Sequence, residues 1–451
     1  MCTSIDRICA SIGSSATRIV SVACDTFWHS LLGLDERGVP VTPIFTWADT
    51  RSSHAAIELS QRLDEDAVHR RTGCGIHSSY WPAKLAWLQK SDRDAFSLAR
   101  YWVSFGEFAY LQYFRERRVS ISMASATGLL DQNLCSWDEE VLENLPIDER
   151  QLSPLHDFSD RFEHLREPYA QRWPALAKIP WYLPLGDGAS NSIGSGGFAD
   201  DQAVVMVGTS GAIRVVREEE QVEIPEGIWT YRVDRRRFVQ GGALSAGGNV
   251  FAWLTQALHL RDIPTLEDEL LEMHADAHGL TVLPFLAGER SPYWSPHARA
   301  AIFGLTLDTS DDDIVRACLE AISFRFGLVY EILARTVPSV KGIIGSGAGL
   351  IHSPAWMQIM SDVLGKPMVA SASPEATCRG AALMTLEAMG VIHDIAELDV
   401  PLGVRYVPIP HNTKIYRDAM VRQQALYERL TEFDRSIDVA PPDEPSSQTV
   451  M

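Results

Sequence analysis

The sequence predicts an α/β protein with two domains. The chain has 451 residues, of which 46% are hydrophobic and 22% are charged, as in ordinary globular proteins. At roughly 100–200 residues per domain this length allows two or three domains, and we expect two. Apolar runs of strand length end in glycine-rich loops and alternate with patterns of helical spacing. These observations exclude a disordered, collagen-like or coiled-coil protein.

The first half of the chain begins with a short helix and a strand. Residues 4–10 have the pattern of a helix end, and residues 18–24 form a β-branched run of strand length. Residues 30–34 and 39–45 predict a β-hairpin, because the turn-forming segment 35–38 separates two apolar runs. The other expected elements of this half are helices at 54–63, 84–89 and 108–114, connecting structure at 152–174, and a strand at 181–185.

The second half starts again with a strand. Residues 203–207 are apolar, a glycine-containing loop follows at 208–211, and residues 212–216 form a second strand. The other expected elements are strands at 229–233, 238–240 and 342–344, helices around Trp253, at 312–332 and at 354–364, and a disordered tail at 441–447.

Charge and cysteine content narrow the class of partner and the compartment. Forty Lys and Arg residues stand against 59 Asp and Glu residues, a net charge of −19, so we expect neither nucleic acid nor an anionic membrane as partner. The seven cysteines never form a CxxC pair, which is typical of free thiols in a reducing compartment. The sequence shows neither a signal-peptide pattern nor an apolar stretch of about 20 residues. We therefore expect a cytoplasmic protein.

Three glycine-rich loops follow apolar strands, at 186–197, 208–211 and 345–349. Backbone N–H groups at such turns bind anions, and phosphate is their natural ligand. No loop has the GxxxxGK[ST] pattern, and residues 345–350 lack the third glycine of a dinucleotide-binding motif. Each loop taken singly is more often a tight turn than a phosphate site.

Asp187 stands between Gly186 and Gly188 at the end of a strand-like run. These small neighbours let a substrate approach the carboxylate, which suits a base that accepts a proton from an attacking sugar hydroxyl in phosphoryl transfer. From the residues alone, a turn-forming Asp-Gly pair is the more common explanation.

A cluster of polar and aromatic residues lies early in the chain. His29, Asp49, Arg51 and Lys84 are interspersed with tryptophan and tyrosine residues, a combination that suits a sugar, polyol or sugar acid. Arg51 or Lys84 could hold a substrate carboxylate. Individually, such residues are as often surface or core-edge groups.

One histidine pair is a candidate metal site. His274 and His278 have i, i+4 spacing, which can place two ligands on one helix face. Neither an HExxH motif nor an obvious third ligand accompanies them. We therefore assign no metal-binding residue.

Eight sequence blocks carry a family resemblance. They are residues 24–30, 47–51, 84–88, 186–189, 208–211, 288–292, 345–348 with 356–359, and 379–382. In this order they resemble the FGGY carbohydrate kinases, within the actin/hexokinase/Hsp70-like superfamily, and most of all a gluconokinase branch. The resemblance covers residues 18–430 and is far more specific than any one block.

The resemblance implies two ribonuclease H-like domains around a cleft. In such kinases a sugar hydroxyl attacks the γ-phosphate of ATP, and Mg²⁺ accompanies the nucleotide. Closure of the domains would exclude water from the reaction. The implied division is a sugar-binding domain at 1–197, a nucleotide-binding domain at 198–432 and a disordered tail at 433–451.

The resemblance also implies roles for single residues. Asp187 becomes the general base, which reverses the preference for a turn residue. The block 288–292 is a family marker that we expect to shape the cleft. Sugar-side contacts fall to His29, Asp49 and Arg51, with Lys84 as a further substrate-binding residue. Nucleotide-side positions are Gly208 and Thr209 in a phosphate loop, Gly248 beside the nucleotide, and Gly345, Gly347 and Ala348 at the adenosine.

One segment of the family pattern is absent from the sequence. Each domain of this fold should open with a strand–loop–strand hairpin, and the family's first hairpin carries an Asp-x-Gly-Thr-Thr type loop that supports the phosphates of Mg-ATP. The second half has its counterpart at 204–216, whereas the first half begins inside what would be the following helix. We therefore expect an incomplete first domain that lacks roughly 40–60 residues, with an unpaired sheet edge.

The preferred function is phosphorylation of gluconate to 6-phosphogluconate by ATP. Xylulose, another ketose or a polyol stays open as the substrate, because a few side chains decide sugar identity. A protein that binds sugar or nucleotide without catalysis is a second class, in view of the absent loop. An actin- or chaperone-like assembly protein is disfavoured by the sugar-side residues, and a homodimer is left open.

Overall fold

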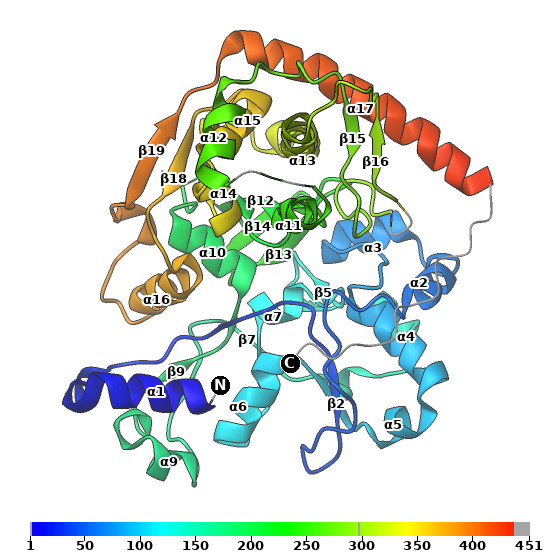
Figure 1. The fold of residues 1–451 in the computed structure, drawn as a ribbon. Helices are drawn as coiled ribbons and strands as arrows, with labels where there is room; N and C mark the ends of the chain where they lie inside the picture. Colours follow the sequence, from blue (N-terminus) through cyan, green and yellow to red (C-terminus); the bar gives the residue numbers. More distant parts are fainter. Residues whose placement is uncertain (1, 200, 259, 261, 296–297, 437–451) are drawn as a thin grey trace. The chain divides into compact units, whose positions relative to one another are not determined.

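The computed structural model describes residues 2–199, 201–258, 260, 262–295 and 298–436 (Figure 1). The chain divides into two compact units, each assembled from segments that are far apart in the sequence. Unit 1 comprises residues 1–202, 214–241 and 372–401, and unit 2 comprises residues 203–213, 242–371 and 402–451.

Unit 1 combines helices with short strands. Its helices are α1 (Cys2–Ile12), α2 (Ser53–Ser60), α3 (Glu65–Thr72), α4 (Trp81–Ser91), α5 (Arg93–Leu98), α6 (Phe105–Phe114), α7 (Ile121–Ser125), α8 (Glu139–Glu143), α9 (Tyr169–Arg172), α10 (Asp187–Ser195) and α16 (Ala376–Ala388). Its strands are β1 (Asp25–Thr26), β2 (Leu32–Leu34), β3 (Tyr101–Val103), β4 (Val119–Ser120), β5 (Leu130–Asp131), β6 (Ser136–Trp137), β7 (Leu155–His156), β8 (Arg161–Phe162), β9 (Trp181–Tyr182), β10 (Leu185–Gly186) and β13 (Trp229–Arg232).

Unit 2 contains longer helices and a parallel strand pair. Its helices are α11 (Gly248–Ala257), α12 (Ile263–Glu272), α13 (Asp311–Thr336), α14 (Ala348–Ile351), α15 (Pro354–Leu364) and α17 (Pro410–Ser436). Its strands are β11 (Gln202–Val207), β15 (Thr281–Leu283), β16 (Ala301–Phe303), β17 (Gly342–Ser346), β18 (Met368–Ser371) and β19 (Leu402–Tyr406). Two further strands, β12 (Gly211–Glu218) and β14 (Arg237–Leu244), are divided between the units along their length.

The core of unit 2 forms around β17 and two helices. β11, β17, β18 and β19 are neighbours in this order, with β17 and β18 parallel and β18 and β19 antiparallel. The predicted helix at 354–364 is confirmed as α15: the Ser353 side chain accepts from the Trp356 N–H at 3.1 Å, and Gly365 ends the helix in a left-handed conformation. α15 packs against α13 and α17, which buries its apolar face (Figure 1).

The predicted first hairpin is confirmed in unit 1. Leu31 forms a bridge with Phe45, and the Asp35 carboxylate accepts hydrogen bonds from the N–H groups of Arg37 and Val39. Gly38 adopts a φ of +78°, a conformation that glycine reaches without steric cost. These contacts fix the turn at 35–38.

The predicted strand at 18–24 is wrong in its position. Residues 13–18 form a 3₁₀ helix, and the β1 ladder begins only at Asp25. Between them, Val22 makes an isolated bridge with Trp181. The β-branched run 19–22 is extended as expected, but it lacks a continuous partner strand because its one bridged neighbour, Trp181, belongs to the two-residue strand β9.

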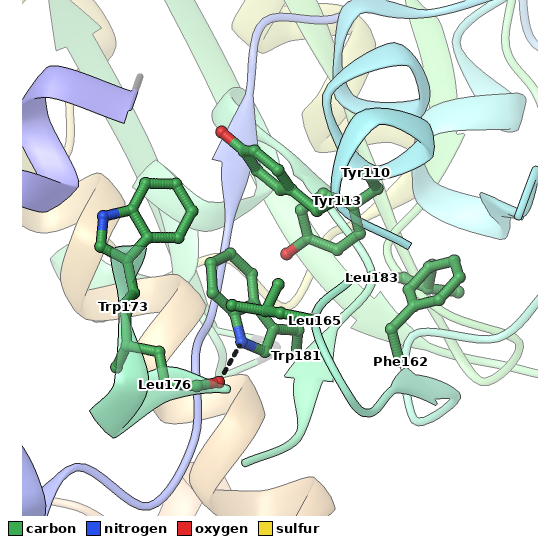
Figure 2. Packing of buried hydrophobic residues seen from close by; sticks show 8 residues of the cluster. All are labelled: Tyr110, Tyr113, Phe162, Leu165, Trp173, Leu176, Trp181 and Leu183. Atoms are coloured by element: carbon green, nitrogen blue, oxygen red, sulfur yellow. Dashed lines mark hydrogen bonds between the residues drawn. The ribbon is translucent and has the colours of Figure 1, made fainter. Parts of the chain in front are cut away.

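An aromatic core supports this part of unit 1. Figure 2 shows Tyr110 and Tyr113 of α6 near Trp181 of β9, whose indole N–H donates to the Leu176 carbonyl at 3.2 Å. Phe114 stacks on Phe162 with ring centroids 4.7 Å apart. Side chains of α1 pack against this cluster, so the apolar face of this amphipathic helix contacts the aromatic core.

Helix α10 was not expected, because its sequence is rich in Gly, Ser and Asn, which are weak helix formers. Its partner explains the composition. A Cβ atom on Gly194 would lie 1.7 Å from the Ala376 carbonyl oxygen, and one on Gly380 would lie 1.9 Å from the Ser190 carbonyl oxygen. α10 and α16 therefore pack backbone against backbone, and close packing outweighs helix propensity.

Two further predictions concern membrane-spanning segments and the C-terminal tail. Within the described residues, no helix has the length and apolar character needed to span a membrane. The expected disordered tail at 441–447 lies outside the described residues.

Candidate active site

Asp187 is the first residue of α10 and directly follows β10. β10 pairs in parallel with β1, with Thr26 opposite Gly186. A Cβ atom on Gly186 would lie 1.8 Å from the Trp28 ring, so only glycine allows this approach. The strand, the tight glycine and the helix start together hold Asp187 at one position.

Asp187 is solvent-exposed, but the surrounding protein still removes part of the water around its carboxyl group. This surrounding protein raises the pKa of Asp187 by desolvation, and the positive charge of Arg214 opposes the rise. The Gly188 N–H donates to Oδ1 at 2.8 Å. Desolvation, followed by the charge of Asp187, also raises the pKa of Asp25 on β1. A carboxylate with a raised pKa is a stronger proton acceptor than ordinary Asp.

An aromatic group lines the same part of unit 1. Trp229 and Tyr231 stack with centroids 4.4 Å apart, and Trp28 meets Tyr231 edge-on at 5.0 Å. The hydroxyl oxygens of Tyr80 and Tyr231 are 2.8 Å apart. His29 packs edge-on against Tyr80 at 5.2 Å and has a φ of +62°, which is uncommon for a residue with a side chain. The predicted sugar-side residue His29 thus belongs to this aromatic group.

Asp49, Arg51 and Lys84 come together in a second group. Arg51 Nε donates to Asp49 Oδ1 at 3.0 Å, and its guanidinium lies 4.8 Å from the centre of the Trp87 ring. Lys84 is 1% exposed and donates to the Ser79 carbonyl. Burial lowers the pKa of Lys84 to about 7, while the charge of Asp49 opposes this. A buried lysine with this pKa can exchange a proton near neutrality.

The predicted nucleotide-side residues converge within unit 2. Gly208 and Thr209 form the turn between β11 and β12, and the Gly248 N–H donates to the Gly208 carbonyl at 2.8 Å. Gly347 has a φ of +84°, and a Cβ atom there would lie 2.4 Å from the Val207 carbonyl oxygen.

These glycines bring three separate loops to one place. Gly345 is the last residue but one of β17, and a Cβ atom on it would meet Met357 Sδ at 2.7 Å. Ala348 is the first residue of the four-residue helix α14. Backbone groups therefore dominate this surface, as a phosphate site requires.

His278, one of the two candidate metal-binding histidines, lies in a hydrogen-bonding network. Asp276, His278 and Glu320 lie close enough to share an ion, which makes them the one such group of three found among the described residues. His278 Nδ1 accepts from the Leu280 N–H at 3.0 Å, and Nε2 donates to Glu320 at 3.0 Å. Arg422 binds Asp276. Each of these three side chains therefore hydrogen-bonds to other protein groups.

Two residues near Asp187 were missed by the sequence reasoning. Asp25 lies inside one of the quoted blocks, but its approach to Asp187 depends on β1–β10 pairing. Arg214 is a charged residue in the otherwise apolar strand 212–216, and this interruption was the signal that could have found it.

Two family models match this chain. The N-terminal domain of the FGGY family of carbohydrate kinases matches residues 1–194, and the C-terminal domain of that family matches residues 203–389. A gluconokinase of Bacillus subtilis (strain 168) is 30% identical over 416 residues, which cover 89% of this chain and 81% of the relative. The chain belongs to the FGGY family of carbohydrate kinases. The resemblance found in the sequence is confirmed.

Solved FGGY structures share the fold. A gluconate kinase from Lactobacillus acidophilus superimposes with a TM-score of 0.86 at 25% identity, covering 93% of this chain and 87% of that structure. Among relatives compared by sequence alone, a xylulose kinase of Staphylococcus xylosus is 24% identical over 413 residues, covering 89% of this chain and 84% of the relative. The predicted two-domain, ribonuclease H-like α/β fold is confirmed, and so is the class of ATP-dependent carbohydrate kinase.

Proposed function

We propose that this FGGY kinase transfers the γ-phosphoryl group of ATP to gluconate and yields 6-phosphogluconate. The observation that carries the proposal is Asp187, an accessible carboxylate flanked by two glycines at the start of α10. The similarity to a gluconokinase and to a gluconate kinase structure supports gluconate as the acceptor.

In the proposed reaction, Asp187 accepts the proton of the attacking sugar hydroxyl. The hydroxyl oxygen forms a bond to the γ-phosphorus, the bond between this phosphorus and the β–γ bridging oxygen breaks, and ADP leaves. The raised pKa of Asp187 supports this role because it strengthens the base. Mg²⁺ is proposed to arrive with ATP, since it prefers phosphate oxygens and water, and we assign no side chain to it.

We further propose that residues 1–197 serve the sugar and residues 198–432 serve the nucleotide. His29, Asp49, Arg51 and Lys84 are the proposed sugar contacts. The grouping of Asp49 with Arg51 and Lys84 supports a shared role. The convergence of backbone groups in unit 2 supports phosphate and adenosine contacts at Gly208, Thr209, Gly248, Gly345, Gly347 and Ala348.

A ketose is the second candidate acceptor, because relatives named xylulose kinase cover a similar share of the chain. We also propose a cytoplasmic location, which the seven unpaired cysteines support.

The test measures ADP formation with Mg-ATP and gluconate, xylulose, glycerol or fuculose. We expect the highest kcat/KM for gluconate, and a loss of about 10²–10⁴-fold in Asp187→Asn with gluconate binding retained. Asp148→Asn is the matched control, because Asp148 is a half-exposed surface residue paired with Arg150. If no sugar is phosphorylated, the kinase proposal fails; binding without turnover would instead favour a non-catalytic sensor.

A further inference from the structure

A buried guanidinium beside Asp187 has two nitrogens without a hydrogen-bond partner in the part of the chain that the structure describes. Arg214, on β12, is 8% exposed. Its Nε and Nη1 atoms are shielded from solvent and have no hydrogen-bond partner among the described residues. Burying an unpaired charge costs folding free energy, so such a group in a native protein needs a reason.

The backbone of α10 approaches this guanidinium closely. A Cβ atom on Gly188 would lie 3.1 Å from Nε and 3.2 Å from Cζ of Arg214, so glycine permits the approach. The Trp229 ring centre is 5.9 Å from Cζ. The charge of Arg214 acts on Asp187, yet no ion pair within 4.0 Å joins these two described residues. The positive group and the carboxylate are therefore electrostatically coupled without a direct ion pair.

The other cations proposed for the sugar side are already engaged. Arg51 binds Asp49 through two nitrogens and stacks over Trp87. Lys84 donates to the Ser79 carbonyl close to the charge of Asp49. Arg214 therefore stands out in this region as a cation that protein groups leave unsatisfied.

We infer that Arg214 is a further catalytic residue, whose guanidinium binds the oxygens of the transferring phosphoryl group. This inference rests on the proposed kinase reaction with Asp187 as its base. The attacking hydroxyl must contact Asp187, and the phosphorus must lie next to that hydroxyl. An arginine adjacent to the base is therefore adjacent to the phosphoryl group. Arg214 exchanges no proton; it offsets negative charge on the phosphoryl oxygens while the sugar O–P bond forms and the bond to ADP breaks.

A sugar-acid carboxylate is the less suitable ligand for this guanidinium. In gluconate the carboxylate and the hydroxyl that is phosphorylated terminate opposite ends of a six-carbon chain, roughly 7 Å apart when extended at 1.5 Å per carbon–carbon bond. The guanidinium fork matches phosphate oxygens as well as it matches a carboxylate. Position beside the base therefore favours the phosphoryl group.

The test compares the kinetics of Arg214→Met, Arg214→Ala and wild type. The acceptor in each assay is the sugar that wild type phosphorylates best. We expect Arg214→Met to lower kcat by about 10²–10³-fold with little change in the sugar KM, as for loss of one charge-stabilising group. Binding of ADP with aluminium fluoride, which mimics the transferring phosphoryl group, should weaken in parallel. Added methylguanidine should restore part of the rate to Arg214→Ala. Arg217→Met is the matched control on the same strand, because Arg217 pairs with Glu219.

The outcomes separate the two proposals. If wild type phosphorylates no sugar, the proposed function fails and the inference fails with it. If wild type is active and Arg214→Met weakens only sugar acids through KM, Arg214 holds the carboxylate and the inference is overturned. Unchanged kcat in a folded Arg214→Met protein, or unchanged binding of ADP with aluminium fluoride, also overturns it. Folding of each variant is verified by circular dichroism.

Discussion

Two buried arginines of this kinase differ in how the protein satisfies them. Arg316 in unit 2 is 5% exposed; its Nε donates to Glu320 at 2.6 Å, its Nη2 to the Tyr416 hydroxyl at 2.8 Å, and its Nη1 to the Leu270 carbonyl. Arg214 in unit 1 is similarly buried, and the described residues leave two of its nitrogens without partners. A saturated buried charge serves the fold, whereas an unsaturated one needs a further explanation, which we propose is a ligand.

The network around Arg316 shows what saturation does to its partner. Burial alone would raise the pKa of Glu320, but hydrogen bonds from His278 and Arg316 and their charges together lower it. Tyr416 also donates to Glu320, at 2.8 Å. The Arg316–Glu320 bond lies within α13, whereas the bonds to His278, Leu270 and Tyr416 link α13 to other segments of unit 2. The network therefore helps to hold that unit together.

The largest expected contrast is in stability. Arg316→Met should lower the free energy of unfolding by about 3–5 kcal/mol, because it leaves Glu320 buried with one cation fewer. Arg214→Met should not lower it, since an apolar side chain replaces an unsatisfied buried charge. Urea unfolding followed by circular dichroism checks both. A larger loss of unfolding free energy in Arg214→Met than in Arg316→Met would contradict this distinction between the two arginines.

Lys84 is an intermediate case, a buried cation with one carbonyl partner, and it predicts a pH effect. Its pKa is about 7 in the folded protein and about 10.4 when unfolded, so the unfolded chain binds more protons between these values. Stability relative to Lys84→Met should therefore rise with pH above 7, by up to about 1.4 kcal/mol per pH unit.

Unfolding free energies of wild type and Lys84→Met at pH 7 and pH 9 measure this difference, since other titrating groups cancel between the two proteins. Lys90→Met is a suitable control, because Lys90 is exposed and pairs with Glu58 on the surface. A difference that stays constant or falls with pH contradicts the buried, partly satisfied state of Lys84.

The smallest expected effect is on the acid side of the pH profile of kcat/KM. Two charged side chains are electrostatically coupled to Asp187: Asp25 on β1, whose pKa Asp187 raises, and Arg214 on β12, which lowers the pKa of Asp187. Arg214 lowers the pKa of Asp187, so its replacement by Met should raise that pKa. The fall in kcat/KM on acidification should then begin at higher pH. An acid side that stays in place or moves to lower pH would show that Arg214 does not act on the base.

The sequence predicted what depends on local pattern. The hairpin at 30–45 followed from turn residues between two apolar runs, and α15 followed from its caps and helical spacing. Asp187 was placed at the end of a strand because the preceding run and the flanking glycines are contiguous with it. The family resemblance added an ordered set of such blocks, which is why the fold and enzyme class could be predicted.

Contacts between distant segments could not be predicted. Helix α10 contradicts its own helix propensity, and only the close approach of α16 explains it. The surroundings of Arg214 include Gly188 and Trp229, which lie 26 and 15 residues away along the chain. The roles of the sugar-side and nucleotide-side residues stay predictions.

The backbone contact between α10 and α16 also sets an order of events during synthesis. The helix that begins with Asp187 is synthesised early, but its supporting partner, α16, becomes available only after residues 376–388 have been synthesised and have left the ribosome. At roughly 5–20 residues per second, the nascent chain waits about 10–40 s between the two. The glycine-lined face of α10 stays uncovered for that interval, so unit 1 matures late although most of it is synthesised first.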